Sequence, residues 1–177
     1  MPTAVLPLGM LADSFGRVAR DLRVSLTDRC NLRCSYCMPA EGLEWLPGDS
    51  VLTDAEVIRL IGVAVQLLGV RKLRFTGGEP LLRHGLADII AAASDLRTDE
   101  GLAPELSLTT NGLGLDKKIG QLAAAGLQRV NISLDSLNRQ RYAALARRDR
   151  LDDVLRGLAA GAVAGLSPIK VNTVVMR

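Results

Sequence analysis

An alternation of strand-like and helix-like segments, running from residue 22 to the end of the chain, constrains the fold more than any other feature. Segments of strand character are expected at 22–27, 72–76, 105–109, 129–134 and 169–176. Apolar residues at helical spacing occupy the intervals, at 54–68, 86–96, 117–125, 139–146 and 151–164. Such alternation is typical of parallel βαβ units, whose right-handed crossovers wind the sheet in one direction. We therefore expect an α/β protein with a barrel or an open sheet.

Length and composition indicate a single globular domain. The chain has 177 residues, of which 48% are hydrophobic and 23% charged, and its net charge of +3 is too small to indicate a nucleic-acid partner. We expect an N-terminal arm at residues 1–20 and one domain at 21–177. The apolar start of the chain lacks the basic region of a signal peptide, and no apolar run reaches membrane-spanning length. Three clustered cysteines favour a reducing compartment over a disulfide framework, so we predict a cytoplasmic protein without a membrane partner.

All three cysteines lie in one short stretch after the first predicted strand. Cys30, Cys34 and Cys37 have the spacing C-x3-C-x2-C, and a short loop is expected to wrap them around one point. Thiolates at this spacing suit zinc or an iron–sulfur cluster. Three ligands are too few for a closed zinc site, whereas a four-iron cluster would keep one iron open for a small molecule. Buried structural thiols are the alternative, but the polar residues between the cysteines form no apolar face.

Other residues that could carry chemistry also follow strand ends. Gly77-Gly78-Glu79-Pro80 follows the second predicted strand, Thr109–Gly112 the third, and Ser133 and Asp135 lie at the fourth. In parallel α/β barrels these ends share the face where active sites are built, so the pattern favours a barrel-like site. Two consecutive glycines let a backbone approach a ligand closely, although a tight turn before a helix would also use them.

Three cations lie within predicted strands. Arg23, Arg74 and Lys170 belong to the first, second and fifth strands, and cations on strands usually face solvent. In a barrel they would point inward instead. Inward cations are rarely left unpaired, so this arrangement would indicate an anionic ligand such as a phosphate.

The cysteine spacing resembles the signature of the radical S-adenosylmethionine superfamily. Within it, the stretch 22–39 resembles the molybdenum cofactor biosynthesis protein A family, the GTP 3′,8-cyclases. Four later stretches agree with that family in order and spacing, at 73–83, 108–112, 129–137 and 169–172. The resemblance covers the chain from about Phe15 onward.

The resemblance implies cofactors and site residues. A [4Fe–4S] cluster would be held by Cys30, Cys34 and Cys37. S-adenosylmethionine would bind the open iron and contact Tyr36, Gly78 and Ser133. GTP would contact Arg23, Arg74, Thr109 and Lys170. A side chain at Gly78 is expected to weaken cofactor binding while leaving the iron content intact.

The implied activity is that of a radical S-adenosylmethionine lyase. Reductive cleavage of the cofactor gives a 5′-deoxyadenosyl radical, which removes the ribose 3′ hydrogen of GTP. The product is 3′,8-cyclo-7,8-dihydro-GTP, and no side chain acts as an acid or base. Expected partners are GTP, a flavodoxin-like one-electron donor and cyclic pyranopterin monophosphate synthase, which would be the next enzyme of the pathway. The chain could also form a homodimer.

The family's chains continue into a C-terminal half with a second three-cysteine cluster and a Gly-Gly tail. This sequence is therefore expected to be a truncated form, with about five units of a partial (βα)6 TIM-like barrel. Two alternatives stay open. Another radical S-adenosylmethionine enzyme, such as a peptide-modifying one, would share the cysteine loop without requiring the three cations. A small iron–sulfur or zinc-binding module would need no βα units.

Overall fold

A five-stranded parallel sheet organises the molecule, in a computed structural model that describes residues 9–176. The strands lie in chain order: β1 (Asp21–Ser25), β2 (Lys72–Thr76), β3 (Glu105–Thr110), β4 (Arg129–Ser133) and β5 (Ile169–Asn172). Every neighbouring pair is parallel. Crossovers that always step the same way produce this order. The predicted α/β fold is confirmed, and its winding is that of a partial TIM-like barrel.

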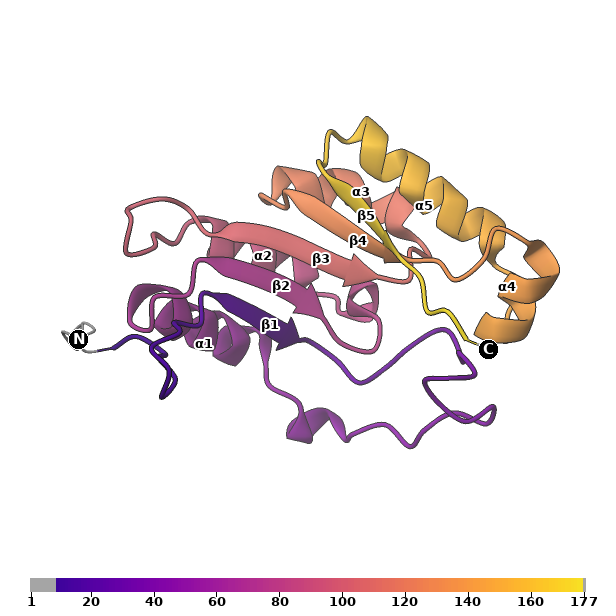
Figure 1. Cartoon of the computed structure of the whole chain (residues 1–177), viewed down its shortest axis with the longest axis horizontal. Helices are drawn as coiled ribbons and strands as arrows, with labels where there is room; N and C mark the ends of the chain where they lie inside the picture. The colour runs from indigo at the N-terminus through magenta and orange to yellow at the C-terminus, as the bar shows by residue number, and fades with distance from the viewer. Residues whose placement is uncertain (1–8, 177) are drawn as a thin grey trace.

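The main helices cover one face of the sheet (Figure 1). They are α1 (Asp54–Gln66), α2 (Leu86–Ser94), α3 (Leu115–Ala124) and α5 (Leu151–Val163). Helix α4 (Arg139–Ala146) lies instead beyond the carboxyl ends of the strands (Figure 1). Short 3-10 turns occur at η1 (Gly48–Ser50) and η2 (Pro80–Leu82). Thr53 caps α1 in a capping box with Glu56 that satisfies backbone donors of the first turn.

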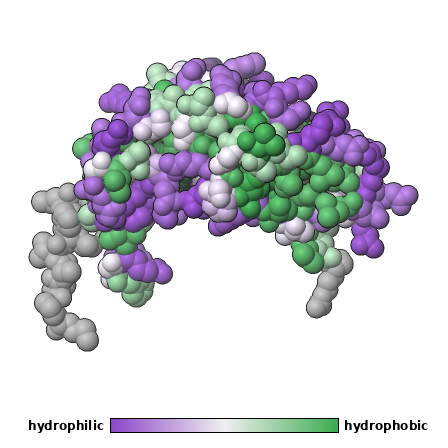
Figure 2. All heavy atoms as spheres, turned by 90° about the horizontal axis from the view of Figure 1, so that it is seen from above, coloured by the Kyte–Doolittle hydropathy of each residue, from purple (hydrophilic) through white to green (hydrophobic). Residues whose placement is uncertain are grey.

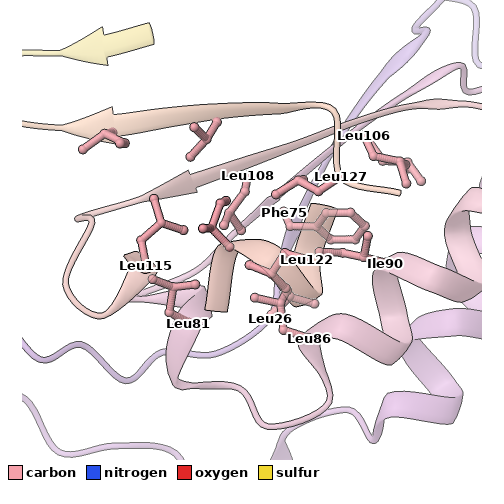
Figure 3. Packing of buried hydrophobic residues seen from close by; sticks show 14 of the residues in the cluster. Leu26, Phe75, Leu81, Leu86, Ile90, Leu106, Leu108, Leu115, Leu122 and Leu127 are labelled. Atoms are coloured by element: carbon pink, nitrogen blue, oxygen red, sulfur yellow. The ribbon is translucent and has the colours of Figure 1, made fainter. Parts of the chain in front are cut away.

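Alternation along the strands divides the sheet into two faces. The face under the helices is apolar, and Phe75, Leu106 and Leu108 are fully buried there against helix residues such as Ile90 and Leu122 (Figure 3). A parallel sheet covered on both faces would show continuous apolar runs. Here the intervening positions are polar, so the second face is built for water or a ligand.

The polar face is the inside of an arch. Figure 2 shows the molecule hollowed on its lower side, with hydrophilic residues near the middle of the hollow. Arg23 on β1 is in register with Arg74 on β2, and Asn131 on β4 with Lys170 on β5. Residues in register share a face, so these side chains belong to the concave side and the predicted inward cations are placed there.

Strand β5 is shorter than predicted. The expected strand ran to Met176, but the observed one ends at Asn172. Beyond it, Thr173 donates its hydroxyl to the carbonyl of Leu134 at 2.8 Å, and the backbone N–H of Val174 donates to the Asp135 carboxylate at 2.9 Å. Side-chain groups thus replace the backbone ladder and turn the chain away from the sheet.

The segment before β1 forms only an isolated antiparallel bridge, between Ala12 and Val18. Residues 1–8 of the predicted arm lie outside the described residues, and the division at residue 20 stays a prediction. Within residues 9–176, no helix is long and apolar enough to cross a membrane.

Candidate functional site

A cavity of about 260 Å³ lies at the carboxyl ends of the strands. All three cysteines line it, from the loop that connects β1 to α1. The strand ends contribute the remaining polar and glycine positions: Thr76, Gly77, Gly78, Thr109, Thr110, Asn111 and Ser133. Tyr36 also lines the cavity. The structure therefore brings together the cysteines and the residues expected to contact S-adenosylmethionine, together with Thr109.

The start of the cysteine loop is held against the end of β2 by backbone contacts. The N–H of Gly78 donates to the carbonyl of Thr27 at 2.6 Å, and the N–H of Glu79 donates to that of Arg29 at 2.7 Å. A Cβ at Gly78 would lie 2.3 Å from the Arg29 oxygen, and one at Gly77 would lie 2.5 Å from the Thr27 oxygen. Gly77 also has a φ of 151°. The double glycine thus lets the chain's own loop approach, a role that the sequence did not indicate.

Arg83 fastens the two ends of the loop. Its guanidinium donates to the carbonyl of Leu26 at 2.6 Å and to that of Leu52 at 2.7 Å. It also pairs with the Asp54 carboxylate at the start of α1, at 2.6 Å. The Arg83 side chain is only 12% exposed. A planar guanidinium can serve these acceptors together, which a lysine could not.

The far side of the loop rests on α4. The N–H groups of Arg33 and Ser35, which flank Cys34, donate to the carbonyls of Ala146 and Leu145 at 3.2 and 2.8 Å. These carbonyls belong to the last turn of α4, where backbone acceptors lack helical partners. Arg33 also stacks over Trp45, 5.4 Å from the ring centroid, so the two side chains pack together within the loop.

Glu79 joins the ends of β2 and β3. Its carboxylate is fully buried and accepts from the Thr110 hydroxyl and the Asn111 N–H, both at 2.7 Å, and from the Leu81 N–H at 3.0 Å. Burial raises the pKa of Glu79, against these hydrogen bonds and the charge of Lys118, which lower it. Glu79 therefore fixes the two strand ends that line the cavity.

Cys30 and Cys34 are partly buried, Cys37 is exposed, and the thiols are electrostatically linked. Burial raises the pKa of Cys30 and of Cys34, and the neighbouring thiols raise both further. The Asn111 amide lies 3.9 Å from the Cys30 sulfur as a donor, and it also donates to Asn31 at 2.7 Å. Among residues 9–176, no three His, Cys, Asp or Glu side chains are close enough to hold a single metal ion. The thiols thus surround a shared cavity and do not converge on one point.

Tyr36 and Asp135 connect the cysteine loop to the end of β4. The Tyr36 hydroxyl donates to Asp135 at 2.7 Å, and the other Asp135 oxygen accepts from Val174. Burial, and then this hydrogen bond, raise the pKa of Tyr36. Asp135 thereby ties the loop, β4 and the segment after β5 together.

A second cavity of about 220 Å³ lies on the polar face, nearer the strand starts. Arg74, Asn131 and Lys170 line it. The Nε of Arg74 is buried without a hydrogen-bond partner among the described residues. Arg23 lies beside Arg74 in register, so two guanidinium groups occupy neighbouring strand positions. Like charges at this spacing repel, and an anion would relieve both.

Some charged residues that line this cavity form ion pairs with one another. Glu105 pairs with Lys72 at 3.2 Å and also with Arg129. By contrast, no ion pair is found for Arg23, Arg74 or Lys170 within the described residues. Among the described cations that line this cavity, Arg74 and Lys170 are thus the two without an ion pair, whereas Lys72 and Arg129 are paired.

Sequence reasoning missed the structural roles of Glu79 and Arg83. Both belong to the stretch 73–83 that was singled out, and their positions directly on either side of Pro80, Leu81 and Leu82 were the available signal. A charge that is buried together with an apolar segment needs a partner. The identity of that partner depended on tertiary structure.

Comparison with known families and proteins adds sequence evidence. The profile of the Radical SAM superfamily matches residues 24–177. A GTP 3′,8-cyclase of Corynebacterium glutamicum is 65% identical over 167 residues, which are 94% of this chain and 44% of that protein. GTP 3′,8-cyclase 2 of Mycobacterium bovis is 61% identical over 173 residues, which are 98% of this chain and 47% of that protein. The chain spans about half the length of the curated relatives it matches.

Solved structures show the same fold at low sequence identity. HydG, a maturase of the [FeFe]-hydrogenase, aligns with a TM-score of 0.68 at 15% identity, over 87% of this chain and 34% of that one. SuiB of Streptococcus suis bound to S-adenosylmethionine aligns with a TM-score of 0.66 at 21% identity, over 90% of this chain and 35% of that one. At these identities the likeness concerns the fold.

Proposed function

This chain belongs to the Radical SAM superfamily, and on that premise we propose that it is the S-adenosylmethionine-cleaving part of a GTP 3′,8-cyclase. One observation carries the proposal: relatives of that name are 58–65% identical to the chain over nearly its whole length. The named activity belongs to longer proteins, so the chain is proposed to supply the cofactor site and the anion-binding part of the substrate site.

The residues around the first cavity fit an iron–sulfur cluster and S-adenosylmethionine. Among the described residues, three thiols and no His, Asp or Glu line this cavity, as a cluster with an open iron requires. Ligands of a four-iron cluster bind different iron atoms, so their sulfurs need not meet at one point. We assign the [4Fe–4S] cluster to Cys30, Cys34 and Cys37. Tyr36, Gly78 and Ser133 line the same cavity and are proposed to contact the cofactor.

The cations of the polar face fit a triphosphate. Arg74 offers a buried N–H without a partner, Arg23 lies beside it, and Lys170 lines the same cavity as Arg74. Thr109 lines the cysteine cavity, and its hydroxyl accepts a hydrogen bond from the Asn131 amide at 3.3 Å. Asn131 in turn lines the second cavity, together with Arg74 and Lys170. We propose that GTP lies along this face, with its phosphates at the cations and its ribose near Thr109.

The protein's own contribution is positioning. When bound, the cluster and S-adenosylmethionine supply a 5′-deoxyadenosyl radical that can remove a ribose hydrogen. Arg23, Arg74 and Lys170 would hold the phosphates, which fixes the distance of the ribose from the cysteine cavity. The partly buried cavity limits water near the radical. A one-electron donor, cyclic pyranopterin monophosphate synthase and a second copy of the chain are partners that we propose on the family's example.

Two measurements test the proposal. Protein reconstituted without oxygen should bind about four irons and four sulfides, and Cys34→Ser should abolish this. GTP binding at fixed salt should weaken roughly 10- to 100-fold in Arg74→Ala and in Lys170→Ala. Arg59→Ala, an exposed cation on α1 behind the sheet, is the matched control and should bind as wild type.

Each measurement can contradict a separate part of the proposal. Stoichiometric zinc without sulfide would exclude the cluster. Equal GTP affinity in wild type, Arg74→Ala and Lys170→Ala would remove the cations from the substrate site.

A further inference from the structure

Tyr142 on α4 carries a hydroxyl that the fold leaves unused. The residue is 3% exposed, and its hydroxyl oxygen has no hydrogen-bond partner within the described residues. Burial of an unpaired hydroxyl costs free energy that a phenylalanine would avoid. The packing of the ring therefore does not explain the hydroxyl group.

The position of Tyr142 brings it to the cysteine loop. It lies four residues before Ala146, so the two share one face of α4. The carbonyl of Ala146 accepts from Arg33, and that of Leu145 accepts from Ser35, on either side of Cys34. Tyr142 and Ala146 are both buried, at 3% and 2% exposure. The α4 face that carries Tyr142 thus packs toward the segment that holds Cys34.

Electrostatics agree with this placement. Burial, followed by the nearby charges of Cys34 and Asp135, raises the pKa of Tyr142 to about 12. The hydroxyl therefore keeps its proton at neutral pH and can act as a donor. Asp135, whose oxygens accept from Tyr36 and Val174, is not its acceptor in this structure, because the Tyr142 hydroxyl has no hydrogen-bond partner among the described residues.

Two other side-chain donors near the thiols, Asn111 and Tyr36, are already engaged. The Asn111 amide lies at Cys30 and bonds to Asn31, and the single proton of the Tyr36 hydroxyl goes to Asp135. The Tyr36 hydroxyl also lies beside the Cys34 sulfur and lowers the pKa of that thiol, but its proton is committed to Asp135, so Cys34 keeps room for a further donor. Sulfur ligands of iron–sulfur clusters commonly accept such hydrogen bonds, which tune the potential.

We propose that the Tyr142 hydroxyl donates a hydrogen bond to the sulfur of Cys34 when that thiolate binds the iron–sulfur cluster. The inference rests on the proposed function. Tyr142 is then a positioning residue that acts through Cys34 and touches no substrate. A donor at a ligating sulfur stabilises the more negative, reduced state more than the oxidised one, so this hydroxyl raises the cluster's reduction potential.

The test compares Tyr142→Phe, which removes one oxygen, with wild type. Both proteins should take up the same iron and sulfide, and the midpoint potential of the variant, measured by redox titration followed by electron paramagnetic resonance, should be more negative. Ser94→Ala is the matched control: it also removes one hydroxyl, which bonds to the Ala91 carbonyl of α2 at 2.8 Å, and should leave the potential unchanged. Without the cluster, Tyr142→Phe should melt at or above the wild-type temperature, because an unpaired buried group is lost.

The outcomes separate this inference from the proposed function. If wild type takes up no cluster, the proposed function and this inference both fail. If both proteins load fully and have equal potentials, the inference alone fails. A cluster-free Tyr142→Phe protein that melts well below wild type would show that the hydroxyl has a partner within the fold, which also overturns it.

Discussion

Gly78→Ala tests whether the double glycine serves the chain's own loop. The ideal Cβ would lie 2.3 Å from the Arg29 carbonyl oxygen and 2.4 Å from that of Asp28, whereas ordinary contacts begin near 3.4 Å. Both atoms belong to the backbone, so no rotamer change relieves the clash. The segment before Cys30 must move by about 1 Å, and such overpacking costs about 1–3 kcal/mol.

The expected consequence is loss of both stability and iron. For a chain of this size we expect the melting temperature to fall by roughly 2–12 °C. Arg29 directly precedes Cys30, so the first thiol moves with it, and iron content after reconstitution should drop. This differs from the expectation from sequence alone, which left the iron content intact.

The control for Gly78→Ala is Gly120→Ala. Gly120 lies in α3 with nothing within 4 Å of its ideal Cβ, so alanine should stabilise the helix by about 0.5–1 kcal/mol. Iron content and thermal unfolding are measured on both variants. Wild-type melting and full iron content in Gly78→Ala would refute the reasoning, because the backbone would then have accommodated the methyl group without cost.

Two further predictions concern the buried charges around the loop. Arg83→Met should lower the free energy of unfolding by about 2–4 kcal/mol and reduce iron uptake, because three segments lose a shared donor. The control is Arg97→Met, since the Arg97 guanidinium bonds to carbonyls within three residues of it, and this variant should change neither quantity. Denaturant unfolding and iron assays measure both variants. Glu79→Gln should flatten the pH dependence of unfolding. Burial raises the pKa of Glu79 in the folded state, so wild type binds a proton on folding and loses stability as pH rises from the ordinary carboxyl range through the raised pKa. Denaturant titrations across that pH interval measure the free energy of unfolding at each pH. If it changes with pH equally steeply in wild type and Glu79→Gln, the prediction is contradicted.

Much of the fold could be predicted because periodicity is a local property. The pattern of helix α5 depends on residues near in sequence, and this helix was placed to within one residue of its observed bounds. The end of β5 was misplaced for a different reason. The alternation continues to Met176, but the partners that end the strand, Leu134 and Asp135, lie about forty positions away along the chain.

The candidate site was predictable in composition and less so in contacts. Strand-end positions identified the residues that line the cysteine cavity, because parallel strands bring their carboxyl ends to one face. The sequence could not indicate that Gly78 meets Arg29 or that Arg83 reaches Leu26 and Leu52. Those contacts depend on the path of a long loop, which carries no periodic signal.

The register explains how cations on distant strands can serve one ligand. Arg23, Arg74 and Ser107 follow one another across β1, β2 and β3, whereas Thr109, Asn131 and Lys170 form the next row across β3, β4 and β5. Ser107 and Thr109 are two residues apart, so the rows are separated by about 6–7 Å along the strand. An extended polyanion that crosses from one row to the other can contact Arg74 and Lys170 while its remaining part continues toward Thr109 and the cysteine cavity. In the proposed function, the same strands would set both charge recognition and the distance from the phosphates to the thiols. A one-residue slip in any strand would move its contribution to the apolar face.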